Sequence, residues 1–189
     1  MERNLILPTV GPISEDTKKL IQILNYANVL RINGSHNTLK WHQVISNKIK
    51  NLSSETVILL DIPGIKPRTK NKKEIKIKKN ELVRFEYLSN ENKKNVIPIS
   101  NFIPSVNKKV KEFTLSDGTF KFNLKSSSKK HITGVSKSTF TLKPNKGINI
   151  ADSIYDDKKQ LKTYINFIQK SDKIKFDAIG ISYIQSSLV

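Results

Sequence analysis

The sequence predicts a mixed α/β fold in which parallel strands alternate with helices and an all-β domain interrupts them. Two observations support this prediction. In residues 1–69, and again in residues 152–189, apolar runs of strand length alternate with segments of helical periodicity, which is typical of parallel βαβ units. In residues 70–151, short segments alternate apolar and polar residues between turn residues, which is typical of antiparallel strands.

The first part of the chain predicts three strands and two helices. The expected strands are Asn4–Val10, Ala27–Asn33 and Thr56–Asp61. Ser14 is expected to cap the first helix, with Glu15 and Asp16 in its first turn, where carboxylates complement the helix dipole. The second helix is expected to begin at Asn37 or Thr38.

The middle and last parts of the chain complete the pattern. Glu74–Lys78 and Val83–Tyr87 alternate apolar and polar residues, and Ser116-Asp-Gly-Thr119 has the composition of a hairpin turn. Paired lysines mark other turns of this all-β domain and indicate solvated surface. The α/β pattern then resumes with a helix at Tyr155–Ile168 and a buried strand at Asp177–Ile184 that is apolar on both faces.

Composition excludes several classes of protein and site. The 189 residues contain no cysteine, which excludes disulfides and thiolate metal sites. No apolar stretch approaches the roughly 20 residues needed to span a bilayer, so we expect a cytoplasmic protein with no membrane partner. His42 and His131 have no histidine or carboxylate at metal-ligand spacing, so we assign no zinc site.

The net charge of +18 raises the question of nucleic-acid binding. The chain is rich in Lys, Asn and Ile, the residues whose codons are richest in A and T, so an AT-rich genome alone would raise its lysine content. Its lysine pairs are scattered, and it contains no RNA-recognition or helix-turn-helix signature. We therefore expect no specific nucleic-acid partner, only weak, salt-sensitive attraction to polyanions.

Two clusters of polar residues follow predicted strands. Val29–His36 and Ile58–Thr69 each begin as an apolar run and end in small, polar and charged residues. In α/β folds such residues lie at the carboxyl ends of the strands, where ligands bind. The clusters contain two guanidinium groups, an amide, a hydroxyl, an imidazole and a carboxylate: Arg31, Arg68, Asn33, Ser35, His36 and Asp61. This set suits a phosphorylated ligand together with a cation.

Six segments, in this order and at this spacing, resemble motifs of the pyruvate kinase family. They are Pro8–Ser14 (resembling CTIGPAS), Leu30–Asn37 (ARLNFSHG), Leu60–Thr69 (LDTKGPEIRT), Ser116–Gly118 (DDG), Asn145–Ile150 (KKGVNLP) and Ala178–Ile184 (ASFV). The resemblance covers the whole chain as the N-terminal portion of that family. It implies a partial TIM-type (β/α) barrel, about four of eight strands, formed by residues 1–69 and 152–189. Residues 70–151 would form an inserted, β-barrel-like lid domain.

The resemblance also implies the glycolytic transfer of a phosphoryl group between phosphoenolpyruvate and ADP, giving pyruvate and ATP, with K⁺ and Mg²⁺ as cofactors. Arg31 would bind the substrate and act in catalysis at the transferring phosphoryl group. The potassium ligands would be the side chains of Asn33, Ser35 and Asp61 and the carbonyl of Ile62. Nucleotide contacts would come from Asn33, Gly34, Ser35, His36, Arg68 and Lys146.

Several residues depart from the family motifs. Ile62-Pro63 replaces Thr-Lys, Gly34 replaces a bulky aromatic residue, Asn37 replaces a glycine, and Gln185 stands where an arginine is usual. A ligand that is only a backbone carbonyl tolerates Ile62, and Asn can adopt left-handed backbone. These departures keep a second hypothesis open, a non-catalytic relative that binds phosphate or nucleotide as a sensor or partner-binding module.

Much of the family's machinery belongs to later strands. The catalytic lysine, the magnesium-binding carboxylates and the threonine that helps to protonate the enolate have no counterpart in this chain, so the magnesium ligands are absent from it. Four strands make half a barrel, whose apolar fourth strand would expose an unpaired edge. A second polypeptide, self-pairing or a longer protein would complete it. We favour a truncated chain that is inactive alone, and a homo-oligomer, tetrameric in the family, when complete.

Overall fold

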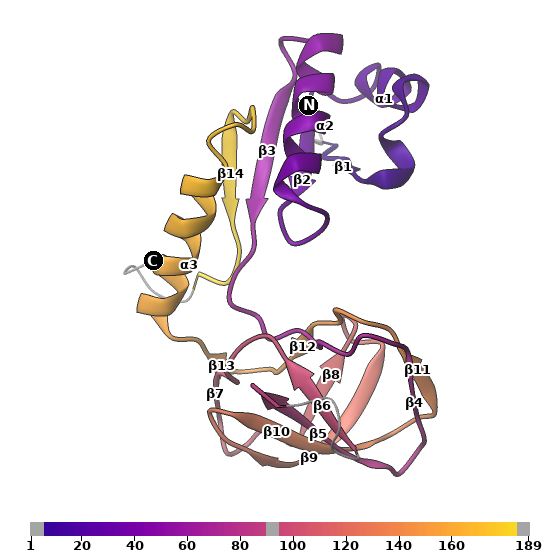
Figure 1. Cartoon of the computed structure of the whole chain (residues 1–189), viewed down its shortest axis with the longest axis vertical. Helices are drawn as coiled ribbons and strands as arrows, with labels where there is room; N and C mark the ends of the chain where they lie inside the picture. Colours follow the sequence, from indigo (N-terminus) through magenta and orange to yellow (C-terminus); the bar gives the residue numbers. More distant parts are fainter. Residues whose placement is uncertain (1–5, 90–94, 185–189) are drawn as a thin grey trace, which may run out of the picture. The chain divides into compact units, whose positions relative to one another are not determined.

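The computed structural model of the chain describes residues 6–89 and 95–184 (Figure 1). The chain divides into two compact units. The α/β unit consists of Met1–Gly64 and Asp157–Val189, and the β unit consists of Ile65–Asp156. The segments 65–69 and 152–156 therefore group with the β unit rather than with the helices and strands that flank it.

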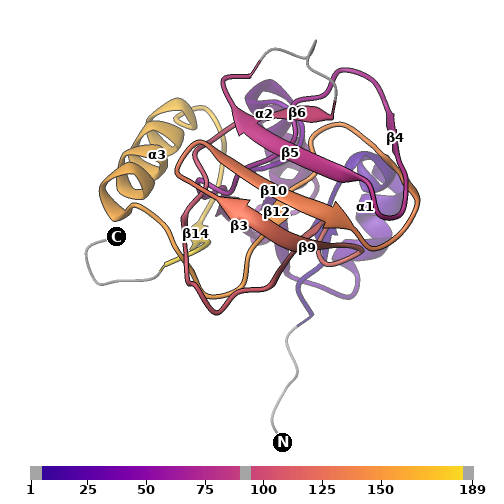
Figure 2. The same cartoon turned by 90° about the horizontal axis from the view of Figure 1, so that it is seen from below.

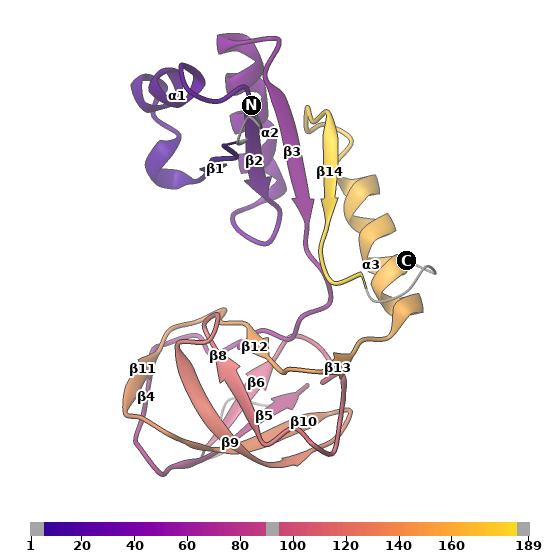
Figure 3. The ribbon, with the colours of Figure 1, turned by 180° about the vertical axis from the view of Figure 1, so that it is seen from behind.

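The α/β unit contains a four-stranded parallel sheet in the order β1-β2-β3-β14 (Figures 1 and 3). Its strands are β1 (Thr9–Val10), β2 (Val29–Asn33), β3 (Val57–Ile62) and β14 (Ala178–Ile181). Together with the inserted β unit, this sheet confirms the predicted fold class, a mixed α/β fold with four strands of an open barrel. β1 is shorter than expected because residues 6–8 form no strand; residues 4 and 5 lie outside the described residues.

Three α-helices and a short 3-10 turn connect these strands: η1 (Pro12–Ser14), α1 (Thr17–Leu24), α2 (Leu39–Leu52) and α3 (Asp157–Lys170). The predicted cap Ser14 is wrong, because its hydroxyl closes the 3-10 turn by accepting a hydrogen bond from the N–H of Gly11 at 3.0 Å. Asp16 caps α1 instead, and its carboxylate accepts from two N–H groups of the first turn at 3.0 and 3.2 Å. Thr38, one of the two expected caps of α2, accepts from the N–H of Trp41 at 3.2 Å.

The core of the α/β unit lies between one face of the sheet and its helices. Alternate residues of β2 and β3 are buried there together with residues of α1 and α2: Leu20, Leu30, Ile32, Ile45, Ile49, Ile58 and Leu60. The intervening residues of β2 and the interior of β3 point to the opposite face and are only half-buried. These two strands are therefore buried on one face, because the sheet stops at four strands within the described residues and its second face is not enclosed there.

The β14 edge of this sheet exposes apolar side chains. Within the described residues β14 pairs only with β3, and its Ile179 and Ile181 are 38% and 42% exposed. The helix α3 beside it (Figure 3) likewise exposes Leu161, Ile165 and Ile168, whereas Tyr164, which the helical spacing places on the same face, is buried. The edge expected from the sequence is thus present, and the strand is less buried than predicted.

The β unit is built around a six-stranded sheet in the order β12-β8-β9-β10-β5-β6, in which β10 lies between β9 and β5 (Figure 2). Two small sheets, β11-β4 and β13-β7, accompany it. The strands are β4 (Ile75–Ile77), β5 (Leu82–Tyr87), β6 (Val96–Ile99), β7 (Ser105–Val106), β8 (Glu112–Leu115), β9 (Phe120–Ser127), β10 (His131–Ser136), β11 (Phe140–Leu142), β12 (Ile148–Asn149) and β13 (Ser153–Ile154).

Three phenylalanine rings form the centre of the β unit. Phe85, Phe113 and Phe122 are fully buried, and their ring centroids lie 5.0 to 5.8 Å apart. The predicted hairpin turn joins β8 to β9, and its Ser116 and Asp117 both have positive φ. The sequence indicated a hairpin turn at this position from its composition.

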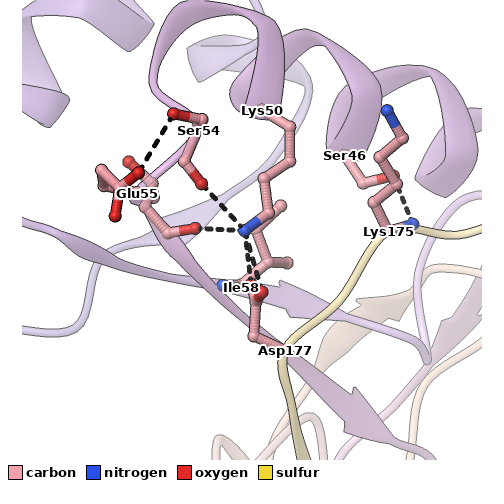
Figure 4. Close-up of polar contacts among 8 residues, drawn as sticks. Ser46, Lys50, Ser54, Glu55, Ile58, Lys175 and Asp177 are labelled. Atoms are coloured by element: carbon pink, nitrogen blue, oxygen red, sulfur yellow. Dashed lines mark hydrogen bonds and ion pairs between the residues drawn. The ribbon is translucent and has the colours of Figure 1, made fainter.

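Asp177 joins the segment that precedes β14 to β3 and α2. Its carboxylate accepts hydrogen bonds from the N–H of Ile58 at 2.7 Å and from Nζ of Lys50 at 2.9 Å (Figure 4). Lys50 also donates to the carbonyl of Thr56 at 2.8 Å. The Lys50 hydrogen bond, followed by that from Ile58, lowers the pKa of Asp177 below its ordinary value of 3.8.

Acid is expected to destabilise the α/β unit through Asp177. Because folding lowers the pKa of this carboxylate, its contribution to stability is complete above the unfolded pKa and is lost as the pH falls through the folded pKa. The Asp177→Asn variant should therefore lose stability near neutral pH and show a smaller fall in unfolding free energy on acidification, measured by urea titration. The exposed Asp172→Asn is the control. An unchanged pH dependence in Asp177→Asn would contradict the role given to its carboxylate.

Candidate functional site

Polar side chains of neighbouring strands meet on the sheet face opposite the core. β1 and β2 pair with Thr9 opposite Arg31, and β2 and β3 pair with Asn33 opposite Asp61. Residues paired in this way point to the same face of a sheet. Arg31 and Asn33 are two residues apart on β2, so they share that face as well. The four side chains therefore lie together toward the carboxyl ends of the strands, where α/β folds bind ligands.

Arg31 and Asp61 form an ion pair across β2 and β3. Nε of Arg31 donates to Oδ2 of Asp61 at 3.1 Å, and one terminal nitrogen donates to the same oxygen. The other terminal nitrogen donates to Oγ1 of Thr9 at 2.8 Å. The two side chains are 27% and 18% exposed, so the pair is partly desolvated and still reachable from solvent. A guanidinium has five N–H donors, which leaves donors for an anionic ligand.

Ser182 extends this contact to the far edge of the sheet. It follows β14, and its hydroxyl donates to Oδ1 of Asp61 at 3.0 Å. A continuous polar chain thus runs across the sheet from Thr9 through Arg31 and Asp61 to Ser182. The sequence reasoning gave no role to Thr9 or Ser182, although Ser182 is the polar residue that ends an apolar run, the same signal that identified Arg31 and Asp61.

The loop after β2 holds the other candidates in a tight turn. Oδ1 of Asn33 accepts a hydrogen bond from the N–H of Ser35 at 2.9 Å, which is an Asx turn. The N–H of Gly34 donates to the carbonyl of Asp61 at 2.9 Å, so the loop is joined to β3. His36 is exposed, and its carbonyl faces Nε2 of His42 at 2.8 Å. The structure therefore brings Asn33, Ser35 and Asp61 into one neighbourhood.

Arg68 and Lys146 lie in the β unit, on two adjacent segments. Arg68 forms an antiparallel bridge with Gly147, and its guanidinium donates to the carbonyl of Asn145 at 3.5 Å. The N–H of Lys146 donates to Oγ1 of Thr69 at 3.0 Å, and its carbonyl accepts from the N–H of Thr69 at 2.9 Å. These two cations, far apart in sequence, are thus neighbours within the β unit.

Almost the whole chain matches a known family. A family model of the pyruvate kinase barrel domain matches residues 1–187. The chain belongs to the pyruvate kinase family. Among solved structures, pyruvate kinase of Cryptosporidium parvum is similar over 96% of this chain, with a TM-score of 0.76 and 20% identity. Pyruvate kinase of Pyrobaculum aerophilum is similar over 95% of it, with a TM-score of 0.69 and 20% identity.

The match covers only part of the pyruvate kinase chains. This chain spans 40% of the Cryptosporidium protein and 42% of the Pyrobaculum protein. No curated protein matches the sequence. The expectation that the chain corresponds to an N-terminal portion of the pyruvate kinase family, with the first barrel strands and the inserted β-domain, is confirmed.

The donor atoms of the candidate site suit a hard cation such as K⁺. An amide oxygen, a hydroxyl, a carboxylate and a carbonyl, from Asn33, Ser35, Asp61 and Ile62, are the oxygen ligands such cations prefer. Arg31 already places a positive charge on the same carboxylate, so a cation there would share Asp61 with it. Residues 6–89 and 95–184 contain no group of three or more His, Asp or Glu residues able to hold a metal ion.

Two further findings concern the described part of the chain. None of its helices is long and apolar enough to cross a membrane.

Asn37 has φ of 59°, so it adopts the left-handed conformation expected where the pyruvate kinase motif has glycine. Gln185, the other departure from the motifs, lies outside the described residues.

Gly34 departs from the aromatic residue of the pyruvate kinase motif because its space is already filled. A Cβ built at this position would lie 2.7 Å from the ring of Phe167 on α3 and 2.8 Å from the carbonyl of Asp61. It would also lie 3.1 Å from the ring of Pro63, the other substituted residue. Phe167 and Pro63 thus occupy the space that a larger residue at 34 would need.

The Gly34→Ala variant is therefore expected to be destabilised. The backbone carbonyl of Asp61 must shift to admit a methyl group, and overpacking of this kind costs about 1–3 kcal/mol. Urea unfolding measures the loss, and Gly11→Ala, which meets no atom within 4 Å, is the matched control. Equal stability of the two alanine variants would show that the loop after β2 accommodates the methyl group without cost, which would contradict the prediction.

Proposed function

We propose that this chain supplies the phosphate-binding and monovalent-cation-binding part of a pyruvate kinase site. The reaction is phosphoryl transfer between phosphoenolpyruvate and ADP to give pyruvate and ATP. The observation that supports it best is the Arg31–Asp61 pair, which lies toward the carboxyl ends of adjacent parallel strands in a member of this family. The carboxyl ends of such strands are where barrel enzymes place their chemistry.

Arg31 is proposed to bind the substrate and to stabilise the phosphoryl group during its transfer. This reaction depends on positioning and on charge compensation at the phosphoryl oxygens rather than on covalent chemistry. A guanidinium suits the task because its planar fork can donate two parallel hydrogen bonds to one phosphate. Thr9 and Asp61 hold that fork from two sides before a ligand arrives, which limits the ordering needed on binding.

The cation roles follow from the donor set. We propose that Asn33, Ser35, Asp61 and the carbonyl of Ile62 hold K⁺, and that the Mg²⁺ ligands belong to barrel strands beyond this chain. When bound, the two cations would supply further positive charge beside the phosphates. The chain's own contribution is a carboxylate, Asp61, whose two oxygens are fixed by Arg31 and Ser182.

Candidate nucleotide contacts are proposed in each unit by itself. In the α/β unit the candidates are Asn33, Gly34, Ser35 and His36, where the Asx turn fixes the loop. In the β unit they are Arg68 and Lys146, two cations on adjacent segments that suit the phosphates of ADP. From family membership we further propose a cytoplasmic location and a homo-oligomer once the barrel is complete.

Binding to this chain tests the proposal directly. Isothermal titration of phosphoenolpyruvate should show binding in KCl and weaker binding in tetramethylammonium chloride at equal ionic strength. A protein that joins this chain to the remaining barrel strands should convert phosphoenolpyruvate and ADP to pyruvate, measured with a coupled dehydrogenase. Absence of binding in both salts would overturn the proposed site.

A non-catalytic pyruvate kinase relative is the second candidate. The packing of Gly34 and Pro63 favours it, because Phe167 and Pro63 leave no room at Gly34 for the aromatic side chain of the family motif. In this case the joined protein would bind nucleotide or phosphate and would not turn over. Measurable turnover by the joined protein would remove this candidate.

A further inference from the structure

Helix α3 buries two polar side chains in place of its isoleucines. Gln160 and Tyr164 are 1% and 3% exposed, and they are the buried residues of this helix. Burying polar groups costs free energy unless they form hydrogen bonds. The hydrogen bonds that these two form therefore indicate what the helix holds in place.

Both side chains donate to the segment that follows β14. The hydroxyl of Tyr164 donates to the carbonyl of Ser182, and Nε2 of Gln160 donates to the carbonyl of Tyr183 at 2.5 Å. Tyr183 has φ of 66°, an uncommon conformation for a non-glycine residue. Gly64, after β3, packs on the same segment, because a Cβ there would lie 2.8 Å from the Tyr183 ring. The backbone at 182–183 is therefore held from α3 and from the β3 side.

The same segment carries the hydroxyl that contacts Asp61. Ser182 donates to Oδ1 of Asp61, whose Oδ2 accepts from Arg31. We propose that Gln160 and Tyr164 are positioning residues of the phosphate site: they fix the backbone of Ser182, which fixes the Asp61 carboxylate and, through it, the Arg31 guanidinium. The effect on ligand binding rests on the proposed function, whereas the effect on Arg31 does not.

The test monitors the Arg31 side chain by NMR in the 189-residue chain. The hydrogen exchange rate of its Nε–H, observed by ¹⁵N NMR, reports the hydrogen bond to Asp61. Tyr164→Phe and Ser182→Ala should each raise this rate and weaken the binding of inorganic phosphate by about 2- to 12-fold, the effect of one hydrogen bond. Ser182→Thr, which keeps the hydroxyl, should restore both, and the Tyr164→Phe, Ser182→Ala double variant should be no worse than Ser182→Ala.

Matched controls separate positioning from stability. Ser171 is fully buried, and its hydroxyl donates to the carbonyl of Phe167 within α3. Ser171→Ala should lower the unfolding temperature without changing Arg31 exchange or phosphate affinity. Tyr26→Phe, at an 84% exposed tyrosine, should change neither.

The outcomes distinguish the two proposals. Unchanged Arg31 exchange in folded Tyr164→Phe and Ser182→Ala would overturn the positioning role. If Tyr164→Phe does not fold, the comparison of Ser182→Ala with Ser182→Thr decides, and equal exchange rates in that pair would also overturn it. If the variants alter Arg31 exchange but the wild-type chain binds no phosphate, the positioning role stands and the proposed function is removed.

Discussion

The Arg31→Ala variant is expected to lose phosphate binding more completely than any other single substitution. Hydrogen bonds to charged groups contribute about 1.5–3 kcal/mol, so phosphoenolpyruvate affinity should fall by about 10- to 100-fold or more. Arg31→Lys keeps the charge and loses the planar fork that Thr9 and Asp61 hold, so an intermediate loss is expected. Isothermal titration of each variant against phosphoenolpyruvate in KCl measures both effects.

The positive charge of the whole chain makes a control necessary. With a net charge of +18, the protein attracts any anion to some degree, and salt screens this attraction. Arg84 lies in the β unit and pairs with Glu86, so Arg84→Ala removes the same charge without touching the site. Equal losses in Arg31→Ala and Arg84→Ala would show nonspecific attraction and contradict the assignment of Arg31.

Most of the fold is predictable from the sequence because its parallel strands are continuous apolar runs. Val29–Asn33 and Val57–Ile62 lie within or next to the predicted ranges, since apolar runs of this length are typical of strands in parallel sheets. The ends of helices are harder to predict. Ser14 and Asp16 are both good caps, but the Ser14 hydroxyl is engaged by Gly11 in the 3-10 turn, so Asp16 caps α1.

The burial of α3 was only partly predictable from its periodicity. Leu161, Tyr164, Ile165 and Ile168 repeat with helical spacing, yet of these only Tyr164 is buried, together with Gln160. The reason is tertiary, because those two side chains satisfy carbonyls of a segment that follows α3 in the chain. A pattern within the helix itself carries no information about such partners.

The candidate site was predictable in part. Arg31, Asn33 and Asp61 follow apolar runs, and parallel pairing of β2 with β3 necessarily brings them to one face. The direct pairing of Arg31 with Asp61, and the roles of Thr9 and Ser182 beside it, depend on side-chain conformations that no sequence pattern specifies. The proximity of Arg68 to Lys146 depends on how segments far apart in the chain pair within the β unit.

Removing the Asp61 carboxylate is expected to remove the effect of K⁺ on the protein. A cation that binds only the folded chain stabilises it more as its concentration rises, with a logarithmic dependence, so wild-type unfolding free energy should rise with KCl relative to tetramethylammonium chloride. In Asp61→Ala, Arg31 loses its partner and Ser182 its acceptor. For a partly exposed pair the unfolding free energy should fall by about 1–3 kcal/mol. The extra stability in KCl over tetramethylammonium chloride should disappear. Urea titrations in the two salts measure both quantities.

Two further variants separate charge from geometry at Asp61. Asp61→Asn keeps an oxygen able to accept from Ser182 and loses the charge, so it should remain more stable than Asp61→Ala while still losing most of the K⁺ effect. Asp177→Asn removes a carboxylate bonded to Lys50 and Ile58 elsewhere in the same unit, so its response to K⁺ should equal that of the wild type. A full K⁺ response in Asp61→Ala would mean that the cation binds elsewhere, because a hard monovalent cation is held by the oxygen atoms that surround it, and Asp61 is the charged one in this set.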